Sequence, residues 1–345
     1  MLEFWLRYDL RSPAVFGRGS AELARAAIEQ VEWADKRGFH RVELTEHHGT
    51  PDNVNPSPLI MAAAMASRTS TIRFQPSAII LPLHDPIRIA EDCIMVDIVS
   101  NGRLDVTLGL GYMPAEFAMF GISLKDRARI MDSKLEALGH ALKRESFEYE
   151  GRKIRVTPCP AQDGGPALFI GGGVRAAAHR AARFGDGYYP MTYRDDYVAE
   201  YRRVCAELGK APGRVINGNG VTVIHIAEDP EQAWAELAPY ALYENNAYAA
   251  NAASAGQALH QQSTESTEAL RASGNYLVLT PDEGLSYCRE RHDLGRHIVI
   301  NPLICGVDPE FSWKSLELIA SRIIPELAAQ ESPLDGHGGL ANGYR

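Results

Sequence analysis

The sequence predicts an α/β protein built as a closed (β/α)8 barrel. Eight apolar segments alternate with segments of helical periodicity along the 345 residues. Strict alternation is typical of a parallel sheet with helical crossovers, and eight repeats favour closure into a barrel. No predicted strand is followed by the GxGxxG dinucleotide fingerprint, which makes a doubly wound open sheet the second choice.

The expected strands end at glycine, proline or polar turn residues. The third is almost continuously apolar, as a strand covered on both faces requires. The eight predicted strands are residues 2–10, 39–45, 71–81, 103–110, 167–170, 186–191, 215–227 and 296–304.

The helices between these strands carry recognisable start signals. Asp85-Pro86, Asp229-Pro230 and Asp308-Pro309 each place proline in the first turn of a helix, where its missing N–H costs nothing. The predicted helices are residues 21–37, 59–67, 87–99, 126–143, 174–184, 195–208, 281–291 and 308–327, with a further one starting at 229–231.

Two segments interrupt the alternation. Glu150-Gly151 lies between two short extended runs and predicts a hairpin within 147–156. Residues 241–279, rich in Ala, Asn, Gln, Ser and Thr, are interpreted as an inserted, partly helical segment that covers a site, with a mobile surface loop as the alternative. We expect one domain over 1–330 and a flexible, glycine-rich C-terminal tail over 331–345.

Charge and cysteine content narrow the possible partners and the compartment. The net charge of −9 and the lack of a basic stripe argue against binding to nucleic acid or to an acidic membrane. Five scattered cysteines without a CxxC pair argue against a disulfide framework or a structural zinc site. The chain shows neither a signal peptide nor a run of about 20 apolar residues. We therefore expect a cytoplasmic protein.

The second predicted strand ends in Glu46, His47 and His48. In a parallel barrel this end of the strand is where chemistry takes place. Neighbouring side chains on a strand point to opposite faces, so both imidazoles can face the barrel mouth only if the strand has already ended. Neither HExxH nor a further matching ligand cluster is present, and we expect no metal site. No Gly-x-Ser-x-Gly nucleophile elbow is present either.

The fifth predicted strand runs into Gly171-Gly172-Gly173, and a helix follows. Exposed backbone N–H groups at such a junction can bind a phosphate monoester. Arg127, Arg129 or Arg175 could supply positive charge. The alternative is a tight turn that simply needs small residues.

These motifs occur in an order that resembles the bacterial luciferase-like, flavin-dependent monooxygenase family (alkanal monooxygenase-like). The similarity covers most of residues 1–230 and, weakly, the last strand and helix. The segments that carry it are 45–58, 77–92, 101–104, 109–112, 116–117, 120–121, 171–173 and 181–187.

The resemblance implies a TIM-type barrel that holds reduced FMN at the C-terminal ends of its strands. His47 resembles the family's catalytic histidine, and Glu46 and His48 would line the flavin site with it. Ser77-Ala78 falls where the family has a non-prolyl cis peptide bond beneath the flavin rings. The other implied cofactor-binding positions are Leu110, Tyr112, Gly172, Gly173 and Val174, with Arg127 and Arg129 flanking the place of the phosphate-binding arginine.

Two positions depart from the luciferase itself, which has an arginine in place of Leu110 and a reactive cysteine in place of Gly109. Light emission is therefore not implied. The resemblance implies a monooxygenase that uses O2 and oxidises a small hydrophobic molecule such as an aldehyde or ketone. Because no NAD(P)H-binding region is recognised, we expect a separate NAD(P)H-dependent flavin reductase to supply the reduced FMN.

Two alternatives remain open at this stage. Related members of the superfamily transfer hydride with a deazaflavin coenzyme, and some luciferase relatives are non-catalytic flavin-binding proteins or subunits. The family also implies a homodimer or a larger homo-oligomer. Val15-Phe16, Tyr112-Met113 and residues 241–279 are expected to shape the substrate pocket.

Overall fold

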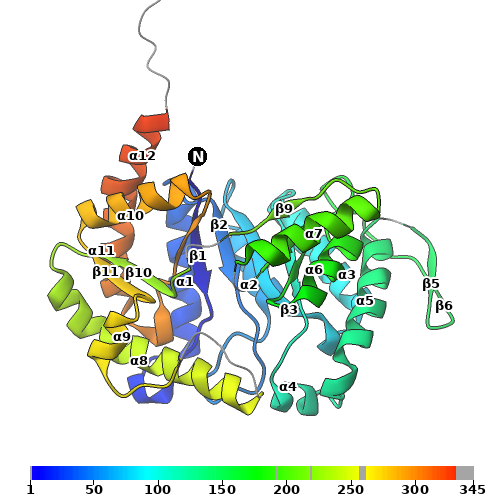
Figure 1. Cartoon of the computed structure of the whole chain (residues 1–345), viewed down its shortest axis with the longest axis horizontal. Coiled ribbons are helices and arrows are strands. Elements are labelled where there is room, and N and C mark those ends of the chain that lie inside the picture. The colour runs from blue at the N-terminus through cyan, green and yellow to red at the C-terminus, as the bar shows by residue number, and fades with distance from the viewer. Residues whose placement is uncertain (1, 144, 191–192, 218–219, 256–261, 332–345) are drawn as a thin grey trace, which may run out of the picture.

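Eight parallel strands form one sheet that curls until its two end strands meet (Figure 1). The structure, a computed structural model, describes residues 2–143, 145–190, 193–217, 220–255 and 262–331. Along the sheet lie β12 (Ile298–Ile300), β1 (Phe4–Tyr8), β2 (Arg41–Leu44), β3 (Arg73–Ile80), β4 (Asp105–Gly109), β7 (Ala167–Gly171), β8 (Gly187–Tyr189) and β9 (Arg214–Val215).

The order of the strands confirms the barrel class. Apart from β12 at the edge beside β1, the strands follow one another in chain order, whereas a doubly wound sheet reverses direction at a switch point. At the seam between the end strands, the backbone N–H of His297 donates to the carbonyl of Asn217 at 3.2 Å. The sheet therefore returns to its own first edge, as a barrel requires.

Helices surround this sheet (Figure 1). The predicted Asp-Pro starts are confirmed, because the side chains of Asp85, Asp229 and Asp308 accept hydrogen bonds from backbone N–H groups in the next turn. The helices are α1 (Ser20–Ala34), α2 (Pro58–Ala66), α3 (Pro86–Ser100), α4 (Pro114–Met119), α5 (Arg127–Leu142), α6 (Arg175–Phe184), α7 (Asp195–Glu207), α8 (Pro230–Ser254), α9 (Thr267–Ala272), α10 (Pro281–Asp293), α11 (Pro309–Leu318) and α12 (Ile324–Glu331).

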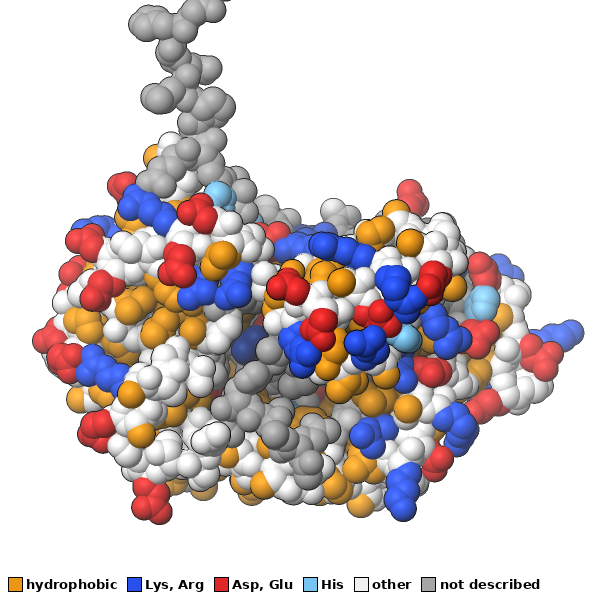
Figure 2. Space-filling model, viewed as in Figure 1, with side chains coloured by type: hydrophobic (Ala, Val, Ile, Leu, Met, Phe, Trp, Pro, Cys, Tyr) orange, Lys and Arg blue, Asp and Glu red, His pale blue; other side chains and the backbone are white. Residues whose placement is uncertain are grey.

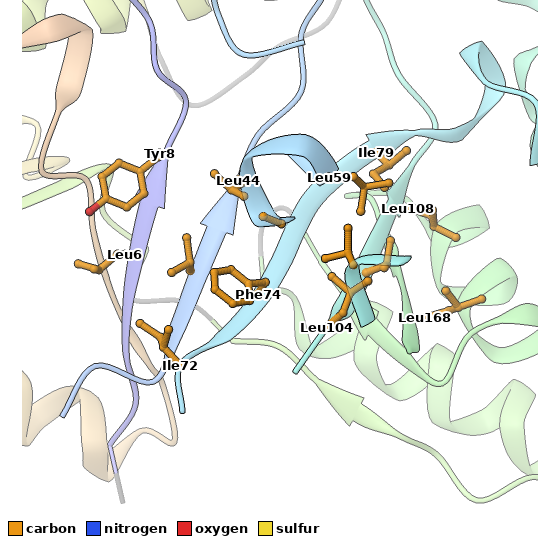
Figure 3. Packing of buried hydrophobic residues seen from close by; sticks show 14 of the residues in the cluster. Leu6, Tyr8, Leu44, Leu59, Ile72, Phe74, Ile79, Leu104, Leu108 and Leu168 are labelled. Atoms are coloured by element: carbon orange, nitrogen blue, oxygen red, sulfur yellow. The ribbon is translucent and has the colours of Figure 1, made fainter. Parts of the chain in front are cut away.

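Successive residues of each strand face alternately the surrounding helices and the barrel interior. The outward set packs against the helices as the main hydrophobic core. Figure 3 shows part of this layer, which includes Leu6, Tyr8, Leu44, Phe74, Leu108 and Leu168. The inward set begins with a small apolar cluster that contains Trp5, Phe169 and Val299. Further along the same strands, the side chains that face the barrel interior are polar.

Polar inward residues occupy the next layer. Arg7 Nε donates to Glu43 Oε2 at 2.7 Å, and the Tyr189 hydroxyl donates to Glu43 Oε1 at 2.7 Å. Glu43 is buried, whereas the Arg7 side chain is 27% exposed. An arginine on a barrel strand keeps that exposure only if solvent reaches the barrel axis, so the interior is open above this layer.

The predicted bounds of the seventh strand were wrong. Residues 215–227 form two strands, β9 and β10 (Val223–Ile226), and β10 leaves the barrel to pair with β11 (Tyr276–Leu279). The sequence from 217 to 220 contains two Asn-Gly pairs, which favour turns, and Gly220 has a φ of +78°. β11 lies within the segment that we interpreted as an insertion, and its four residues were missed.

The two predicted interruptions of the strand–helix alternation are present in the structure. β5 (Phe147–Tyr149) and β6 (Arg152–Ile154) form the predicted hairpin, with Glu150 and Gly151 both at positive φ in its turn. The segment 241–279 is partly helical as expected, although α8 begins before it at Pro230. Glu331 closes α12, and the remainder of the predicted tail lies outside the described residues.

Charged side chains of both signs are interspersed on the face shown in Figure 2, including the area over α6 and α7. Among the described residues, none of the helices is long and apolar enough to cross a membrane.

Candidate active site

The C-terminal ends of β2, β3, β4 and β7 bring the predicted site residues to one end of the barrel. β2 ends at Leu44, so Glu46, His47 and His48 follow the strand instead of alternating on it. The backbone N–H of His47 donates to the carbonyl of Asn55 at 3.1 Å, which fixes the loop. Both histidines are buried, with 9% and 8% exposure.

His47 is held by a carboxylate from a different part of the chain. Its Nδ1 lies 2.9 Å from Oε1 of Glu116, and the same oxygen accepts the backbone N–H of His48 at 3.0 Å. Glu116 has no exposed surface. A buried carboxylate needs donors, so the proton of neutral His47 belongs on Nδ1. Its Nε2 then carries the free lone pair and can act as a base.

Glu116 was missed as a site residue. Glu116-Phe117 contributed to the family resemblance, but no spacing rule connects Glu116 with a histidine 69 positions earlier. Oε2 of Glu116 is buried without a hydrogen-bond partner among the described residues. Apart from that resemblance, the signal was a polar residue in the first turn of the short α4, followed by a large apolar one.

Glu46 forms a second carboxylate centre beside the first. Its Oε1 lies 2.8 Å from Nε2 of His48 and 2.7 Å from Nε2 of His84. Burial raises the pKa of Glu46, but hydrogen bonds from the two imidazoles outweigh it and lower the pKa below its usual value. Glu46 is therefore an ionised acceptor between two imidazole donors.

His84 joins this centre after β3 because Lys134 holds its loop, with Nζ donating to the carbonyls of Pro82 and His84 at 2.8 and 2.7 Å. The sequence showed no further ligand to match Glu46 and His48, and the fold corrects this by supplying His84. Among the described residues, these three side chains are the group whose ligand atoms could reach one metal ion. The expectation of no metal stays a prediction.

The Ser77–Ala78 peptide bond is cis, as the resemblance implied. The surrounding residues are small: a Cβ added to Gly109 would lie 2.8 Å from Cβ of Ala78, and one at Gly171 would lie 3.3 Å from Cγ2 of Thr107. Ser77 Oγ donates to Oγ1 of Thr107 at 3.1 Å. A cysteine in place of Gly109 would require the neighbouring chain to shift. This absence of side-chain bulk fits a flat ring system placed over the cis bond.

The β7–α6 junction, the predicted phosphate site, brings its backbone close to α6. Gly172 has a φ of +147°, and a Cβ there would lie 2.7 Å from Cβ of Ala177. Val174 is the N-cap of α6 and makes no side-chain cap hydrogen bond. The N–H of Ala177 donates to the Val174 carbonyl at 2.9 Å. Among the described residues, the N–H groups of Gly173, Arg175 and Ala176 have no such partner and could face a ligand.

The predicted arginines differ in their surroundings. Arg127 begins α5, donates from Nη1 to the carbonyl of Leu124 at 2.7 Å, and keeps Nε buried without a partner among the described residues. Arg129 is 77% exposed, 3.6 Å from Asp126. Arg175 is 63% exposed and lies 3.7 Å from Glu200. Their contact with a phosphate stays a prediction.

Aromatic side chains complete the mouth. The ring of Tyr112, two residues after the half-buried Leu110, lies 6.1 Å from that of His47, and the ring of Tyr248 lies 6.5 Å from it on the opposite element, α8. Burial raises the pKa of Tyr112 to about 12, while a hydrogen bond with Asn251 lowers it slightly. α8 therefore covers the site, as expected of the 241–279 segment, and it lies with α4 along the lower edge of Figure 1.

A buried acid fastens α8 to the barrel. Glu244 accepts the Tyr276 hydroxyl at 3.0 Å and the Asn301 side-chain amide at 3.3 Å, so α8 is tied to β11 and to the residue that follows β12. Burial, strengthened by Asp9, raises the pKa of Glu244 to about 7. Neither Glu244 nor Tyr248 was singled out from the sequence.

Comparison with known proteins decides the family. The sequence profile described as luciferase-like monooxygenase matches residues 11–286. The chain belongs to the luciferase-like monooxygenase family. The family resemblance seen in the sequence is thereby confirmed.

Relatives within the luciferase-like family are distant. Two proteins of Sinorhizobium fredii are 36% identical over 143 residues and 32% identical over 144 residues. These matches span 41% and 42% of each relative, so the chain covers about two fifths of their length. Limonene 1,2-monooxygenase of Rhodococcus erythropolis is 24% identical over 346 residues, 92% of this chain and 85% of that one.

Solved structures share the fold. The oxygenating constituent of 3,6-diketocamphane monooxygenase of Pseudomonas putida, a type II Baeyer–Villiger enzyme in complex with FMN, has a TM-score of 0.70 at 19% identity over 94% of this chain and 98% of that one. An F420-dependent secondary alcohol dehydrogenase has a TM-score of 0.65 at 15% identity over 93% of this chain and 98% of that one.

The raised pKa of Glu244 predicts a pH-dependent stability. A carboxyl whose pKa rises on folding contributes stability below its unfolded value of about 4.5, and this contribution is lost as the pH approaches 7. Glu244→Gln cannot ionise, so it should match the wild type at pH 5 and exceed it by up to about 3 kcal/mol at pH 8. Urea unfolding measures the difference.

Glu236→Gln is the matched control, because Glu236 is exposed on the same helix. We expect it to leave the pH dependence unchanged. A Glu244→Gln protein whose stability follows that of the wild type between pH 5 and 8 would contradict the buried neutral acid.

Proposed function

We propose that this chain is a monooxygenase that binds reduced FMN in the barrel mouth and uses O2 to oxidise a small, hydrophobic organic molecule such as an aldehyde or ketone. One observation carries the proposal: Nδ1 of the buried His47 lies 2.9 Å from the buried carboxylate of Glu116, at the same end of the barrel as the glycine-lined cis bond at Ser77–Ala78. We infer from this contact that Nε2 of His47 is the basic nitrogen. A proton acceptor beside a flat, bulk-free surface suits flavin-dependent oxygen chemistry.

Reduced FMN would supply the two electrons with which O2 is reduced while one of its atoms enters the substrate. Nε2 of His47 would accept a proton from the reacting group and return it, with Glu116 stabilising the imidazolium. Glu46 would keep His48 and His84 oriented as donors. α8, with Tyr248 and the Tyr112–Asn251 hydrogen bond, would exclude water.

The phosphate of FMN would lie at the start of α6, where Gly173 and Val174 offer backbone N–H groups and the helix dipole favours an anion. The N–H of Gly172 already donates to the carbonyl of Tyr189 at 3.1 Å, so Gly172 would contribute close approach of the backbone. Of the three predicted arginines, Arg127 is the best candidate, because its Nε is buried without a partner among the described residues, whereas Arg129 and Arg175 are exposed beside Asp126 and Glu200.

A separate NAD(P)H-dependent reductase is proposed as the source of reduced FMN. The sequence shows no GxGxxG fingerprint after a strand, and the diketocamphane relative is itself an oxygenating constituent. The cytoplasm would provide the reducing surroundings that the free cysteines require, of which Cys159 is exposed. A homodimer or larger homo-oligomer is proposed from the family resemblance.

Hydride transfer with a deazaflavin coenzyme is the second candidate function. The fold is shared with an F420-dependent dehydrogenase, and Ser77 at the cis bond suits either ring system. FMN is favoured by the monooxygenase profile that matches residues 11–286.

Anaerobic titration separates the two cofactors. We expect the protein to bind reduced FMN more tightly than the reduced deazaflavin, and an oxygen pulse to reoxidise bound FMN at least tenfold more slowly than free FMN, because α8 shields it. Stopped-flow absorbance follows the return of the oxidised flavin spectrum. Binding of the deazaflavin alone would select hydride transfer, and binding of neither would contradict both functions.

The role of His47 predicts a selective loss of turnover. With reduced FMN supplied by a flavin reductase and a panel of aldehydes and ketones, His47→Ala should lower kcat by about 10²–10⁴-fold, the usual contribution of a positioned acid–base group. Glu116→Gln should lower it less, because the amide oxygen can still accept from Nδ1. Reduced FMN should bind to both variants.

His140→Ala serves as the control. The His140 side chain is 44% exposed on α5, and it pairs with Glu145 instead of with a residue of the barrel mouth. It should retain wild-type turnover. Full activity of His47→Ala would exclude the proposed role.

A further inference from the structure

Arg7 is a charged residue whose side chain points into the barrel. It follows Trp5 on β1 by two positions, and side chains two apart on a strand share a face. Trp5 packs with Phe169 of β7 in the inward apolar cluster, whereas Leu6 belongs to the outward core. Arg7 therefore lies above the floor that Trp5 and Phe169 form, toward the C-terminal ends of the strands.

The contacts of Arg7 cross the barrel. Its Nε donates to Glu43 of β2 at 2.7 Å, and Glu43 accepts the Tyr189 hydroxyl, also at 2.7 Å. β8, which carries Tyr189, neighbours neither β1 nor β2 in the sheet. The guanidinium is thus held in the interior by residues from two separate parts of the sheet.

Part of the arginine fork has no partner. Among the described residues, neither Nη1 nor Nη2 of Arg7 has a hydrogen-bond acceptor at normal geometry. The Tyr189 hydroxyl also attracts this guanidinium, but one hydroxyl oxygen cannot accept from all of its N–H groups. Neither nitrogen is fully buried, and the side chain is 27% exposed. N–H groups of Arg7 therefore face the accessible space inside the barrel.

α8 lies over this space. Burial lowers the pKa of Arg7, but Glu43 and two tyrosine hydroxyls outweigh it and raise the pKa. One hydroxyl is that of Tyr189, and the other belongs to Tyr248 of α8. The ring of Tyr248 lies 6.5 Å from that of His47. Tyr248 is therefore a neighbour of both Arg7 and the proposed base, His47.

The proposed flavin site uses a different part of the mouth. The cis bond, the glycines beside it and the proposed phosphate site belong to β3, β4 and β7. Three strands lie between β1 and β7 in either direction around the barrel. A molecule that reacts at the flavin would approach from the remaining side, which Arg7, His47 and Tyr248 border.

The charge balance indicates which kind of group Arg7 can bind. Glu43, which is 2% exposed, already neutralises the guanidinium. A carboxylate bound to Nη1 or Nη2 would be a second buried negative charge on the same arginine, which is costly. A neutral carbonyl oxygen needs only a donor, and a charged donor gives a stronger hydrogen bond than a neutral one. The carbonyl of an aldehyde or ketone fits both conditions.

We propose that Arg7 binds the carbonyl oxygen of the substrate through its terminal N–H groups, and that the enzyme thereby selects uncharged aldehydes or ketones over hydrocarbons and carboxylates of the same shape. The hydrogen bond draws electron density toward the carbonyl oxygen and makes the carbonyl carbon more electrophilic. Glu43 and Tyr189 act as positioning residues that hold the guanidinium. The inference rests on the proposed function and adds the residue that recognises its substrate.

Three probes of similar shape test the proposal: acetophenone, isopropenylbenzene and benzoate. They present a carbonyl oxygen, a methylene group and a carboxylate at the same position. Anaerobic titration calorimetry on the protein loaded with reduced FMN should show acetophenone binding at least about tenfold more tightly than isopropenylbenzene, as a charged hydrogen bond allows. Benzoate should bind more weakly than acetophenone. Equal affinities for acetophenone and isopropenylbenzene, tightest binding of benzoate, or no binding of acetophenone would overturn the proposal.

Infrared difference spectra report the hydrogen bond itself. With acetophenone carrying ¹³C at its carbonyl, the carbonyl band should shift to lower wavenumber when the ketone binds to the wild-type protein. An unshifted band in bound acetophenone would overturn the proposal.

Variants assign the binding to Arg7. Arg7→Met combined with Glu43→Gln removes the cation and its counterion together, so no buried charge is left unpaired. It should reduce the preference for acetophenone over isopropenylbenzene to less than about threefold and abolish the infrared shift. Arg7→Lys keeps a cation beside Glu43 but lacks the terminal fork. It should lower the preference as well, which preserves the test if the double variant fails to fold.

Arg88→Met is the matched control, because the Arg88 side chain is 69% exposed on α3, outside the barrel. It should bind all three probes as the wild type does. An unchanged preference in a folded Arg7 variant would overturn the proposal.

Reduced FMN titrated into the same proteins separates this inference from the proposed function. The Arg7 variants should bind reduced FMN within about threefold of the wild type. A tenfold loss of FMN affinity in Arg7→Lys, with the ketone preference retained, would assign Arg7 to the cofactor and overturn the inference alone. Failure of the wild type to bind reduced FMN would overturn the proposed function itself.

Discussion

One oxygen atom of Glu116 holds together the part of the molecule on which the proposed chemistry depends. It bonds the imidazole of His47 and the backbone N–H of His48, and it lies on a short helix that follows β4. A fully buried carboxylate is tolerated only where such donors are present. The position of α4 and the conformation of the loop after β2 are consequently interdependent, and the tautomer of His47 follows from both.

Glu46 applies the same constraint one strand further along the sheet. By accepting from His48 and His84, it connects the loop after β2 to the loop after β3, and its Oε2 also lies 3.4 Å from the backbone N–H of Ile80. Two buried carboxylates thus arrange three imidazoles around one end of the barrel. The glycines at 109, 171 and 172 keep the adjacent strand ends free of side chains, which leaves a surface for a planar cofactor.

Much of this arrangement could be predicted because it depends on local signals. Asp-Pro pairs marked helix starts, apolar runs marked seven of the eight barrel strands closely, and the position of the cis bond at Ser77–Ala78 followed from an ordered family resemblance. The division of 215–227 into β9 and β10 was missed, although two Asn-Gly pairs signalled it. β11 was missed because four apolar residues after a helix-rich segment are too few to separate strand from helix end.

The partners of the site residues could not be predicted, for a different reason. His84 meets Glu46 because the neighbouring strands β3 and β2 end side by side, and Glu116 meets His47 across β3, from the segment that follows β4. Tyr248 and Glu244 reach the mouth from α8, far along the chain, and neither lies in a recognisable motif. Sequence spacing contains no information on such contacts until the strand order is known.

The protonation state of His47 is the most direct test of this account. In protein labelled with ¹⁵N-histidine, with the His47 signals assigned by their loss in His47→Asn, NMR of the ring nitrogens at pH 8 distinguishes the two neutral tautomers. The account predicts that the proton is on Nδ1, bonded to Glu116, and that Nε2 is unprotonated. A proton on Nε2 would contradict it, because His47 would then present a donor to the mouth in place of a base.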